Sequence, residues 1–153
     1  MRYLDRGISM PVGTDLRKLV CDGYPASNVI GCDLRQQYFD LGYELFGDAD
    51  RCPIRFFAGN IFEFSDTATS VPDFGQGASQ DPPNLTSVTN LSQLRGTLTH
   101  IYTGALFHLF NEETQYGLAL RLAALLKRTP GATVFGRHQG LEKAGTIDDH
   151  LDR

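Results

Sequence analysis

The sequence lacks any apolar run approaching the roughly 18 residues that span a bilayer, and its N-terminus lacks a basic, apolar and small-residue signal pattern. Its three cysteines, Cys21, Cys32 and Cys52, are odd in number and have no C-x-x-C spacing. This favours reduced thiols over a disulfide framework or a metal site. The four histidines show no metal-ligand spacing either, so no metal is predicted. We therefore expect a cytoplasmic protein that does not bind a membrane.

Basic charge is also scarce. The 14 Lys and Arg are outnumbered by 18 Asp and Glu, which gives a net charge of −4. This balance argues against nucleic acid as a partner. The 41% hydrophobic and 21% charged fractions are typical of a globular protein, and 153 residues are enough for one domain with one core.

The first 33 residues read as half of a nucleotide-binding βαβ unit. A short strand at residues 3–4 precedes a turn from Gly7 to Gly13, a helix at residues 15–21 capped by Thr14, and a strand at residues 28–32. Asp33 follows 20 residues after Gly13, where a carboxylate would hold a ribose hydroxyl. No G-x-G-x-x-G is present, so an ordinary strand-to-helix turn remains the alternative.

The rest of the chain continues the alternation. We expect helices at residues 34–46, 90–95 and from Asn111 to about residue 128, and strands at residues 54–58, 98–103 and 132–135. In the helix at 34–46 the predicted buried face is Tyr38, Leu41 and Leu45. Five strands separated by helices predict a Rossmann-like, open, mostly parallel sheet with helices on both faces.

Residues 65–87 interrupt this pattern with a stretch rich in Ser, Thr, Pro, Gly and Asp, within a region that has no Lys or Arg between Arg55 and Arg95. A loop of this length inside one domain is either a lid over a site or a solvated insertion. As a lid, it would close with Phe74 over the pocket.

Three blocks carry a family resemblance: DLRKLVCDGYPASNVIGCDLRQQYFDLGYELFGD, IRFFAGNIFEF, and LRGTLTHIYTGALFHLFNEETQYGLALRLAALLKRTPGATVFGRHQG. Together, over residues 4–140, they resemble the class I S-adenosylmethionine-dependent methyltransferases, most closely the small-molecule enzymes of fungal secondary metabolism. The resemblance implies S-adenosylmethionine as cofactor. It also implies roles for individual residues: Asp5, Gly7 and Gly13 at the methionine part, Asp33 at the ribose, Asn60 and Ile61 at the adenine, and Thr103, Phe107 and His108 on the floor between cofactor and substrate.

The sequence also departs from that family. The turn after Asp5 is about two residues too long, Asn60 replaces a common Asp, and the N-terminal roof and the last two strands are not seen. Met10, Pro11 and Val12 add bulk where the cofactor needs close backbone approach.

The candidate chemistry rests on few side chains. His108 is the best general base near the end of the fourth strand, or else a histidine packed between Phe107 and Phe110. Tyr102, Arg137 and His138 are candidates for substrate binding, or else packing and loop residues.

Three functions follow from these patterns. The first is a methyltransferase of secondary metabolism acting on a small hydroxylated natural product. The second is a cyclase or isomerase derived from that fold, and the third is a non-catalytic partner subunit. We also expect a homodimer, because the fifth strand would be left as an apolar edge and surface near Leu106, Phe107 and Phe110 would lack its cover.

Overall fold

The computed structural model describes residues 3–7, 13–64, 84–140 and 142–143 of the chain. Its five short strands pair in parallel, in the order β3-β2-β1-β4-β5. They are β1 (Tyr3–Gly7), β2 (Val29–Asp33), β3 (Arg55–Ala58), β4 (His100–Gly104) and β5 (Thr133–Arg137). The predicted mixed α/β class is confirmed, and the arrangement is compatible with a Rossmann-like fold.

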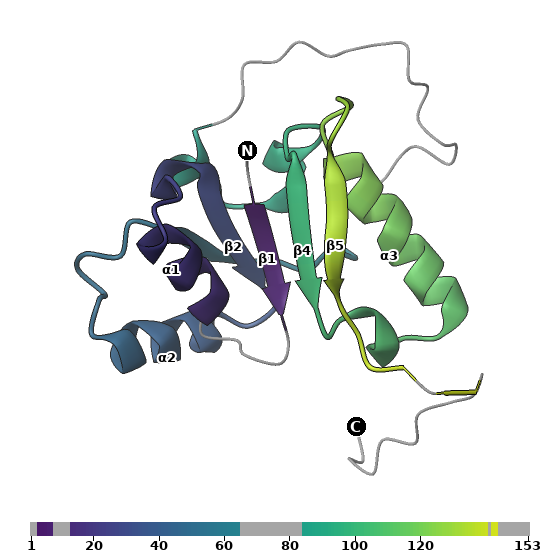
Figure 1. Cartoon of the computed structure of the whole chain (residues 1–153), viewed down its shortest axis with the longest axis horizontal. Helices are drawn as coiled ribbons and strands as arrows, with labels where there is room; N and C mark the ends of the chain where they lie inside the picture. Colours follow the sequence, from purple (N-terminus) through teal and green to yellow (C-terminus); the bar gives the residue numbers. More distant parts are fainter. Residues whose placement is uncertain (1–2, 8–12, 65–83, 141, 144–153) are drawn as a thin grey trace.

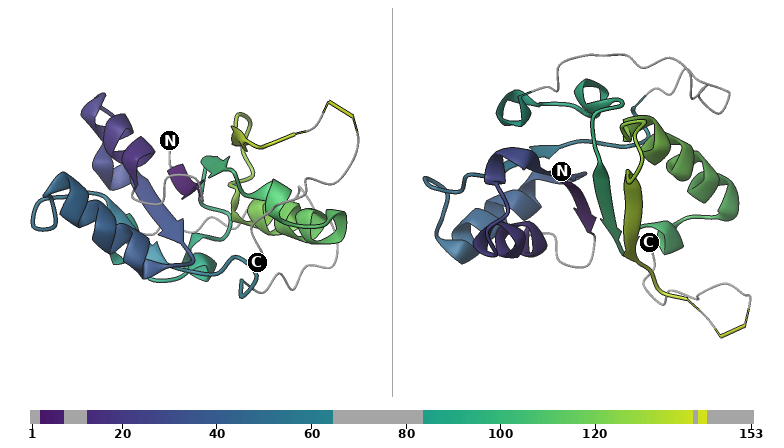
Figure 2. Two further views of the ribbon diagram at one scale, coloured as in Figure 1. Left: turned by 90° about the horizontal axis from the view of Figure 1, so that it is seen from below. Right: turned by 45° about the horizontal axis from the view of Figure 1, so that its top comes forward.

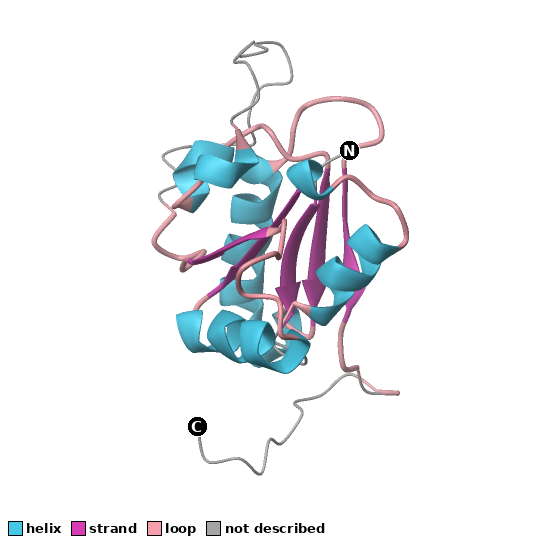
Figure 3. Cartoon of the chain, turned by 90° about the vertical axis from the view of Figure 1, so that its left-hand side faces the viewer, coloured by secondary structure: helices cyan, strands magenta, loops and turns pink. Residues whose placement is uncertain are grey.

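Helices cover both faces of this sheet (Figures 1 and 3). The α-helices are α1 (Thr14–Cys21), α2 (Gln36–Phe46) and α3 (Glu112–Leu125). Four 3-10 turns join them to the strands: η1 (Ala26–Asn28), η2 (Leu85–Ser87), η3 (Leu91–Leu94) and η4 (Phe107–Leu109). Seen from below, α1 and α2 lie on the opposite side from α3 (Figure 2).

The period-two alternation of the strands divides the core into two clusters. Val29 of β2, Phe56 of β3 and Ile54, which immediately precedes β3, form the smaller cluster with two buried helix side chains, Leu16 of α1 and Phe39 of α2. Their immediate neighbours on the same strands, such as Ile30 and Phe57, face the other way. They join the larger cluster, which contains Leu118, Leu122 and Leu125 of α3.

The helix α3 follows its predicted pattern. The Asn111 side chain accepts a hydrogen bond from the Thr114 N–H at 2.9 Å, which confirms the predicted N-cap. Leu118, Leu122 and Leu125 are buried as expected. The helix ends at Leu125, before the basic residues predicted to form its last turn.

The predicted face of α2 is wrong. Leu41 and Leu45 are 52% and 68% exposed, whereas Phe39 is buried and stacks on Phe56 with ring centroids 5.0 Å apart. The helix begins at Gln36 rather than at residue 34, and Leu34 is exposed. Tertiary contact with Phe56 therefore decides which of two apolar stripes packs inward.

The start of α1 also differs from the prediction. Thr14 is the first helical residue and Gly13 is the N-cap, in the left-handed region at φ 73°. A Cβ at Gly13 would lie 2.6 Å from the Phe56 ring. Both the left-handed backbone conformation and this lack of space therefore require glycine.

Other boundaries shift by one or two residues. The predicted strand at 28–32 is Val29–Asp33, with Asn28 in η1, and the strand at 132–135 is Thr133–Arg137. Leu98 lies before β4 in an isolated bridge with Leu126. The predicted helix at 90–95 is the single 3-10 turn η3.

Several expectations fall outside the described residues. These are the bulky turn at 8–12, most of the 65–87 segment including Phe74, and anything following residue 143. The expectation that Leu106 lacks cover is wrong, since it is 6% exposed within the larger cluster. No helix among the described residues is long and apolar enough to cross a membrane.

Candidate functional site

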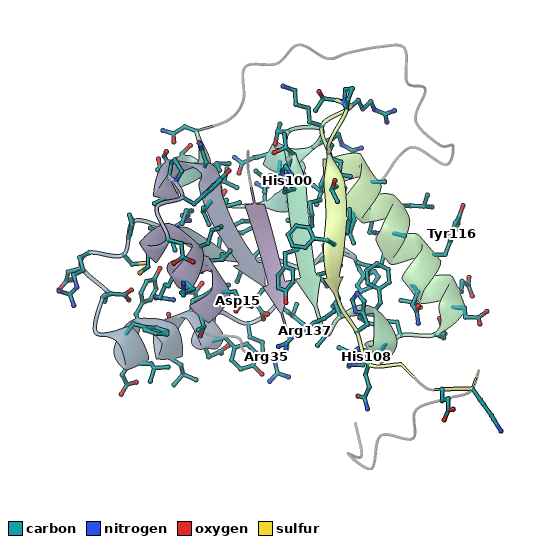
Figure 4. The ribbon with its side chains drawn as sticks, in the orientation of Figure 1. Asp15, Arg35, His100, His108, Tyr116 and Arg137 are labelled. Atoms are coloured by element: carbon teal, nitrogen blue, oxygen red, sulfur yellow. The ribbon has the colours of Figure 1, made fainter. Side chains whose placement is uncertain are left out.

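The strand order reverses direction between β1 and β4. From β1 the chain steps outward to β2 and β3, and then returns across the sheet to β4 and β5. In open parallel sheets, ligands bind at the carboxyl ends of the strands beside such a switch point. Figure 4 shows Arg137 and His108 toward these ends, near the arrow tips, whereas His100 lies at the opposite end.

Asp33 is the last residue of β2 and therefore lies at this edge. Its Oδ1 accepts a hydrogen bond from the Arg35 N–H at 2.9 Å, and its backbone carbonyl accepts from the Gly59 N–H at 2.8 Å. The first bond orients the carboxylate and the second fixes the backbone of this half-buried residue at the end of the strand. This is the position expected of an acceptor for ligand hydroxyl groups.

The neighbouring β3 ends beside Asn60 and Ile61. The Asn60 Oδ1 accepts from the Phe62 N–H at 3.0 Å, and its Nδ2 is 3.4 Å from Glu63 Oε1. Its amide group is thus engaged within its own turn. Ile61 is 2% exposed and belongs to the larger core cluster, so its side chain packs inward rather than lining the open edge.

The end of β4 is conformationally unusual. Thr103 is 1% exposed, and Ala105 adopts a left-handed backbone at φ 53°, which a residue with a Cβ rarely does. The Ala105 N–H donates to the Arg137 carbonyl at 2.7 Å, and this bond ties the chain after β4 to the end of β5. Backbone strain of this kind is typical of ligand sites.

A pocket of about 410 Å³ opens between α1 and the β4–β5 part of the sheet. The residues that line it are Asp15, Leu16, Leu19, Tyr102, Phe135 and Arg137. Tyr102 and Arg137 were predicted to bind substrate, and the structure brings them together here. The other four were not predicted, and Asp15, Leu16 and Leu19 meet the strands only through the fold.

Local packing explains the shape of the pocket wall. The Tyr102 and Phe135 rings lie 5.5 Å apart with an interplanar angle of 48°. A Cβ at Gly104 would approach the Tyr102 hydroxyl to 3.1 Å, so the ring extends over Gly104 toward the carboxyl end of β4. Phe135 and Arg137 are two residues apart on β5 and share this face. That period-two spacing was the sequence signal for Phe135.

The other candidate side chains gather around η4. The Phe107 and His138 rings contact edge to face at 5.1 Å, and the His108 and His138 rings are 6.4 Å apart. The Gln139 N–H donates to His108 Nδ1 at 3.4 Å. Burial, and then the neighbouring His108, lower the pKa of His138 below its usual value. Both effects favour the neutral form of His138.

The candidates thus fall into three groups rather than one. Asp33 and Asn60 lie at the ends of β2 and β3, Tyr102 and Arg137 line the pocket, and His108 and His138 adjoin η4. From β1, Asp5 pairs with Tyr102 and Gly7 pairs with Gly104 through the parallel ladder. Within the described ranges, no three His, Cys, Asp or Glu side chains gather to hold a metal ion.

Several proteins similar to this chain are named methyltransferases. The chain is 29% identical to the O-methyltransferase phiE of a fungal species over 143 residues, which are 94% of this chain. It is 32% identical over 136 residues, 89% of this chain, to the Asnovolin E/Chermesin D methyltransferase nvfJ of Aspergillus novofumigatus. It is 28% identical over 152 residues, 99% of this chain, to the methyltransferase trt5 of Aspergillus terreus.

The chain spans less than half the length of these relatives: 40% of phiE, 40% of nvfJ and 46% of trt5. No family model matches the sequence. The chain is therefore similar to the named fungal methyltransferases over most of its own length, and it corresponds to less than half of each.

Proposed function

We propose that this chain is methyltransferase-like and that it binds S-adenosylmethionine at the carboxyl edge of its sheet to methylate a small hydroxylated natural product. The observation that carries this proposal is the similarity to named methyltransferases over 89–99% of the chain. That similarity extends across β2, with Asp33 at the carboxyl edge beside the switch point.

The residues at that edge fit part of the cofactor. Asp33 Oδ1 already accepts from a backbone N–H, which fixes the carboxylate, and a carboxylate has capacity for further donors. Ribose offers two neighbouring hydroxyl donors to such a group. Gly13 precedes α1 with a left-handed backbone at φ 73°, which places the turn before the helix at the same edge.

Asn60 and Ile61 fit less well. The Asn60 amide contacts Phe62 and Glu63, and the Ile61 side chain is inside the core. We assign the binding energy of this half of the cofactor chiefly to Asp33.

When bound, S-adenosylmethionine supplies an activated methyl group. Methyl transfer depends mainly on the alignment of the acceptor atom with the methyl group. The role of the chain is therefore to hold the acceptor in that alignment. The pocket between α1 and β5 opens at the same edge and supplies that position.

Calorimetric titration with S-adenosylmethionine tests the proposal. We expect saturable binding by the full chain, and a loss of about 30- to 100-fold in affinity in Asp33→Ala, because charge-assisted hydrogen bonds contribute on the order of 2–3 kcal/mol. Asp50→Ala removes an exposed carboxylate elsewhere and is the matched control. Absence of heat at millimolar cofactor, or equal affinities in the two variants, would reject the proposal.

A further inference from the structure

One arginine of α3 has an incomplete set of hydrogen bonds. Arg121 is half-buried, and its Nη1 donates to the Gly117 carbonyl, one turn earlier on the helix, at 2.9 Å. Its Nε is shielded from water and has no acceptor among the described residues. A shielded N–H of a charged group destabilises a protein unless an acceptor reaches it. The Arg121 guanidinium therefore has a donor to offer a ligand.

Aromatic rings lie beside this guanidinium. The Arg121 Cζ is 5.6 Å from the centroid of the Phe62 ring, which belongs to the loop after β3. The Phe62 ring in turn contacts Phe110, which follows η4, edge to face with centroids 5.3 Å apart. Phe62 is 36% exposed and Phe110 is half-buried, so parts of both side chains remain open to contact. A ligand that reaches Arg121 from this side would also meet apolar surface.

Arg17 shows what completes such a group in the same chain. Its Nε donates to Asp48 Oδ2 at 2.7 Å and its Nη2 to Asp48 Oδ1 at 3.0 Å, while the Phe56 ring centroid lies 5.1 Å from its Cζ. Nε and Nη2 form one edge of the guanidinium plane, and the two oxygens of a carboxylate match that edge. Arg121 has the aromatic neighbour, and its Nη1 is bonded at the other end, but its Nε edge lacks the carboxylate.

The described part of the chain does not supply that carboxylate. Arg121 takes part in no ion pair with a described residue. Glu63 follows Phe62 directly, but its Oε1 lies 3.4 Å from the Asn60 amide nitrogen. Because a half-buried charge is stabilised by an ion of opposite sign, the Nε edge of Arg121 favours an anionic ligand.

We propose that Arg121 binds the carboxylate of a small ligand through its Nε and Nη2 edge, with the apolar body of the ligand against Phe62 and Phe110. A carboxylate suits this place better than a phosphate, because a dianion would lose more hydration beside two aromatic rings. The site lies with α3, on the opposite side of the sheet from α1 and its pocket (Figure 2). The inference requires neither S-adenosylmethionine nor Asp33.

Four probes separate the contributions of charge and ring: benzoate, methyl benzoate, acetate and inorganic phosphate. Each is titrated calorimetrically into the full chain at about pH 7 and low ionic strength, without cofactor. We expect benzoate to bind about tenfold more tightly than methyl benzoate, because the ester lacks the charge that pairs with Arg121. Acetate should bind more weakly than benzoate, since it has no ring, and phosphate should also bind more weakly.

Two variants assign the preference for the acid to Arg121. Arg121→Gln should bring the affinity for benzoate to within about twofold of that for methyl benzoate. Arg121→Lys should lose about threefold in benzoate affinity, because an ammonium group keeps the charge but lacks the planar pair of donors. Arg95→Gln is the matched control, since Arg95 is exposed and its Cζ lies 4.6 Å from the Phe64 ring centroid. This variant should bind benzoate as the unaltered chain does.

Nuclear magnetic resonance reports the contact directly in the unaltered chain. With uniform ¹⁵N and ¹³C labelling, the Nε–H signal of Arg121 can be assigned through its own side chain. It should shift on saturation with benzoate and stay in place with methyl benzoate. The Nε–H signal of Arg17, which already donates to Asp48, should not move with either probe. A purely structural role of Arg121 would not produce this selective shift.

The unaltered chain decides the inference even if a variant fails to fold. Equal binding of benzoate and its ester, tighter binding of phosphate or acetate, no binding of any probe, or an unmoved Arg121 Nε–H would overturn it. A folded Arg121→Gln with full benzoate affinity would do the same. Because no cofactor is present, failure to bind S-adenosylmethionine would reject the proposed function alone.

Discussion

Gly136 lies where β4 and β5 approach each other too closely for any side chain. A Cβ at this position would be 1.9 Å from the Thr103 carbonyl oxygen, a backbone atom with little freedom to move. The neighbouring residues Phe135 and Arg137 carry the pocket side chains. The glycine therefore sets the spacing on which the pocket depends.

We expect Gly136→Ala to destabilise the fold by about 2–3 kcal/mol, because overpacking against backbone forces β5 away from β4. Urea unfolding monitored by circular dichroism measures this change. Gly140→Ala is the control, since a Cβ at Gly140 meets nothing within 4 Å, and its effect should stay within about 0.5 kcal/mol. Equal midpoints for the two variants would show that β5 tolerates a side chain here.

Only some of the residues that line the pocket could be predicted from the sequence. Tyr102 and Arg137 were identifiable because polar or aromatic residues near strand ends are recognisable locally. Asp15 and Leu19 were not, because α1 precedes β5 by more than a hundred residues and only the strand order places them together. The burial of Ile61 was not foreseen for a related reason, since it depends on the packing of the larger cluster.

Among the elements, α1 is fastened to its neighbours by one buried arginine. The Arg17 guanidinium pairs with Asp48 after α2, with Nε 2.7 Å from Oδ2 and Nη2 3.0 Å from Oδ1. It also lies over the ring of Phe46 at 4.7 Å and that of Phe56 at 5.1 Å. A bidentate pair stacked on aromatic rings holds α1 against α2 and β3.

Asp48→Asn should lower the free energy of unfolding by about 1–2 kcal/mol at neutral pH, because it leaves the Arg17 charge buried without its anion while Asp48 itself keeps some contact with water. Asp22→Asn at the exposed Lys18–Asp22 pair is the control, and its effect should be within about 0.5 kcal/mol. If Asp48→Asn and Asp22→Asn lost the same free energy of unfolding, the Arg17–Asp48 pair would be no stronger than a surface pair.

The contribution of the Arg17–Asp48 pair depends on pH in a defined direction. The hydrogen bond from Arg17 lowers the pKa of Asp48 below its usual value of 3.8. The stabilisation is therefore fully present above the unfolded-state pKa and is lost as pH falls through the lower folded-state value. The difference in free energy of unfolding between the unaltered chain and Asp48→Asn should be constant above about pH 5 and should become smaller in acid.

The order of helices and strands was predictable because each is short and separated by clear turn residues. The inward face of α2 was not. Its sequence carries apolar residues on two stripes, and Phe39 is selected by stacking on Phe56 from a strand that comes later in the chain. Gly13 as N-cap in place of Thr14 has a similar origin, since the Phe56 ring fills the space a Cβ would need.

For the whole molecule, β5 stands at one edge of the described sheet. Val134 and Phe135, on opposite faces of this strand, are 38% and 42% exposed. Apolar edge strands favour pairing with another chain. We therefore predict a two-fold homodimer through β5.

Light scattering at micromolar concentration should report about twice the 16.9-kDa mass of the chain. Val134→Lys places a charge on the edge strand and should shift the equilibrium toward monomer, whereas Tyr116→Lys alters an exposed residue of α3 and should not. A mass near that of one chain at both low and moderate salt would contradict the dimer.

We propose that S-adenosylmethionine binds at the carboxyl edge of the sheet, beside Asp33. The most direct measurement is a nuclear magnetic resonance titration of the isotopically labelled chain with this cofactor. We expect saturable shifts of the backbone amides at the ends of β2, β3 and β4, with those of Arg35, Gly59 and Ala105 among the largest, and little change at His100. Unchanged spectra at millimolar cofactor, or shifts centred on the opposite edge near His100, would contradict it.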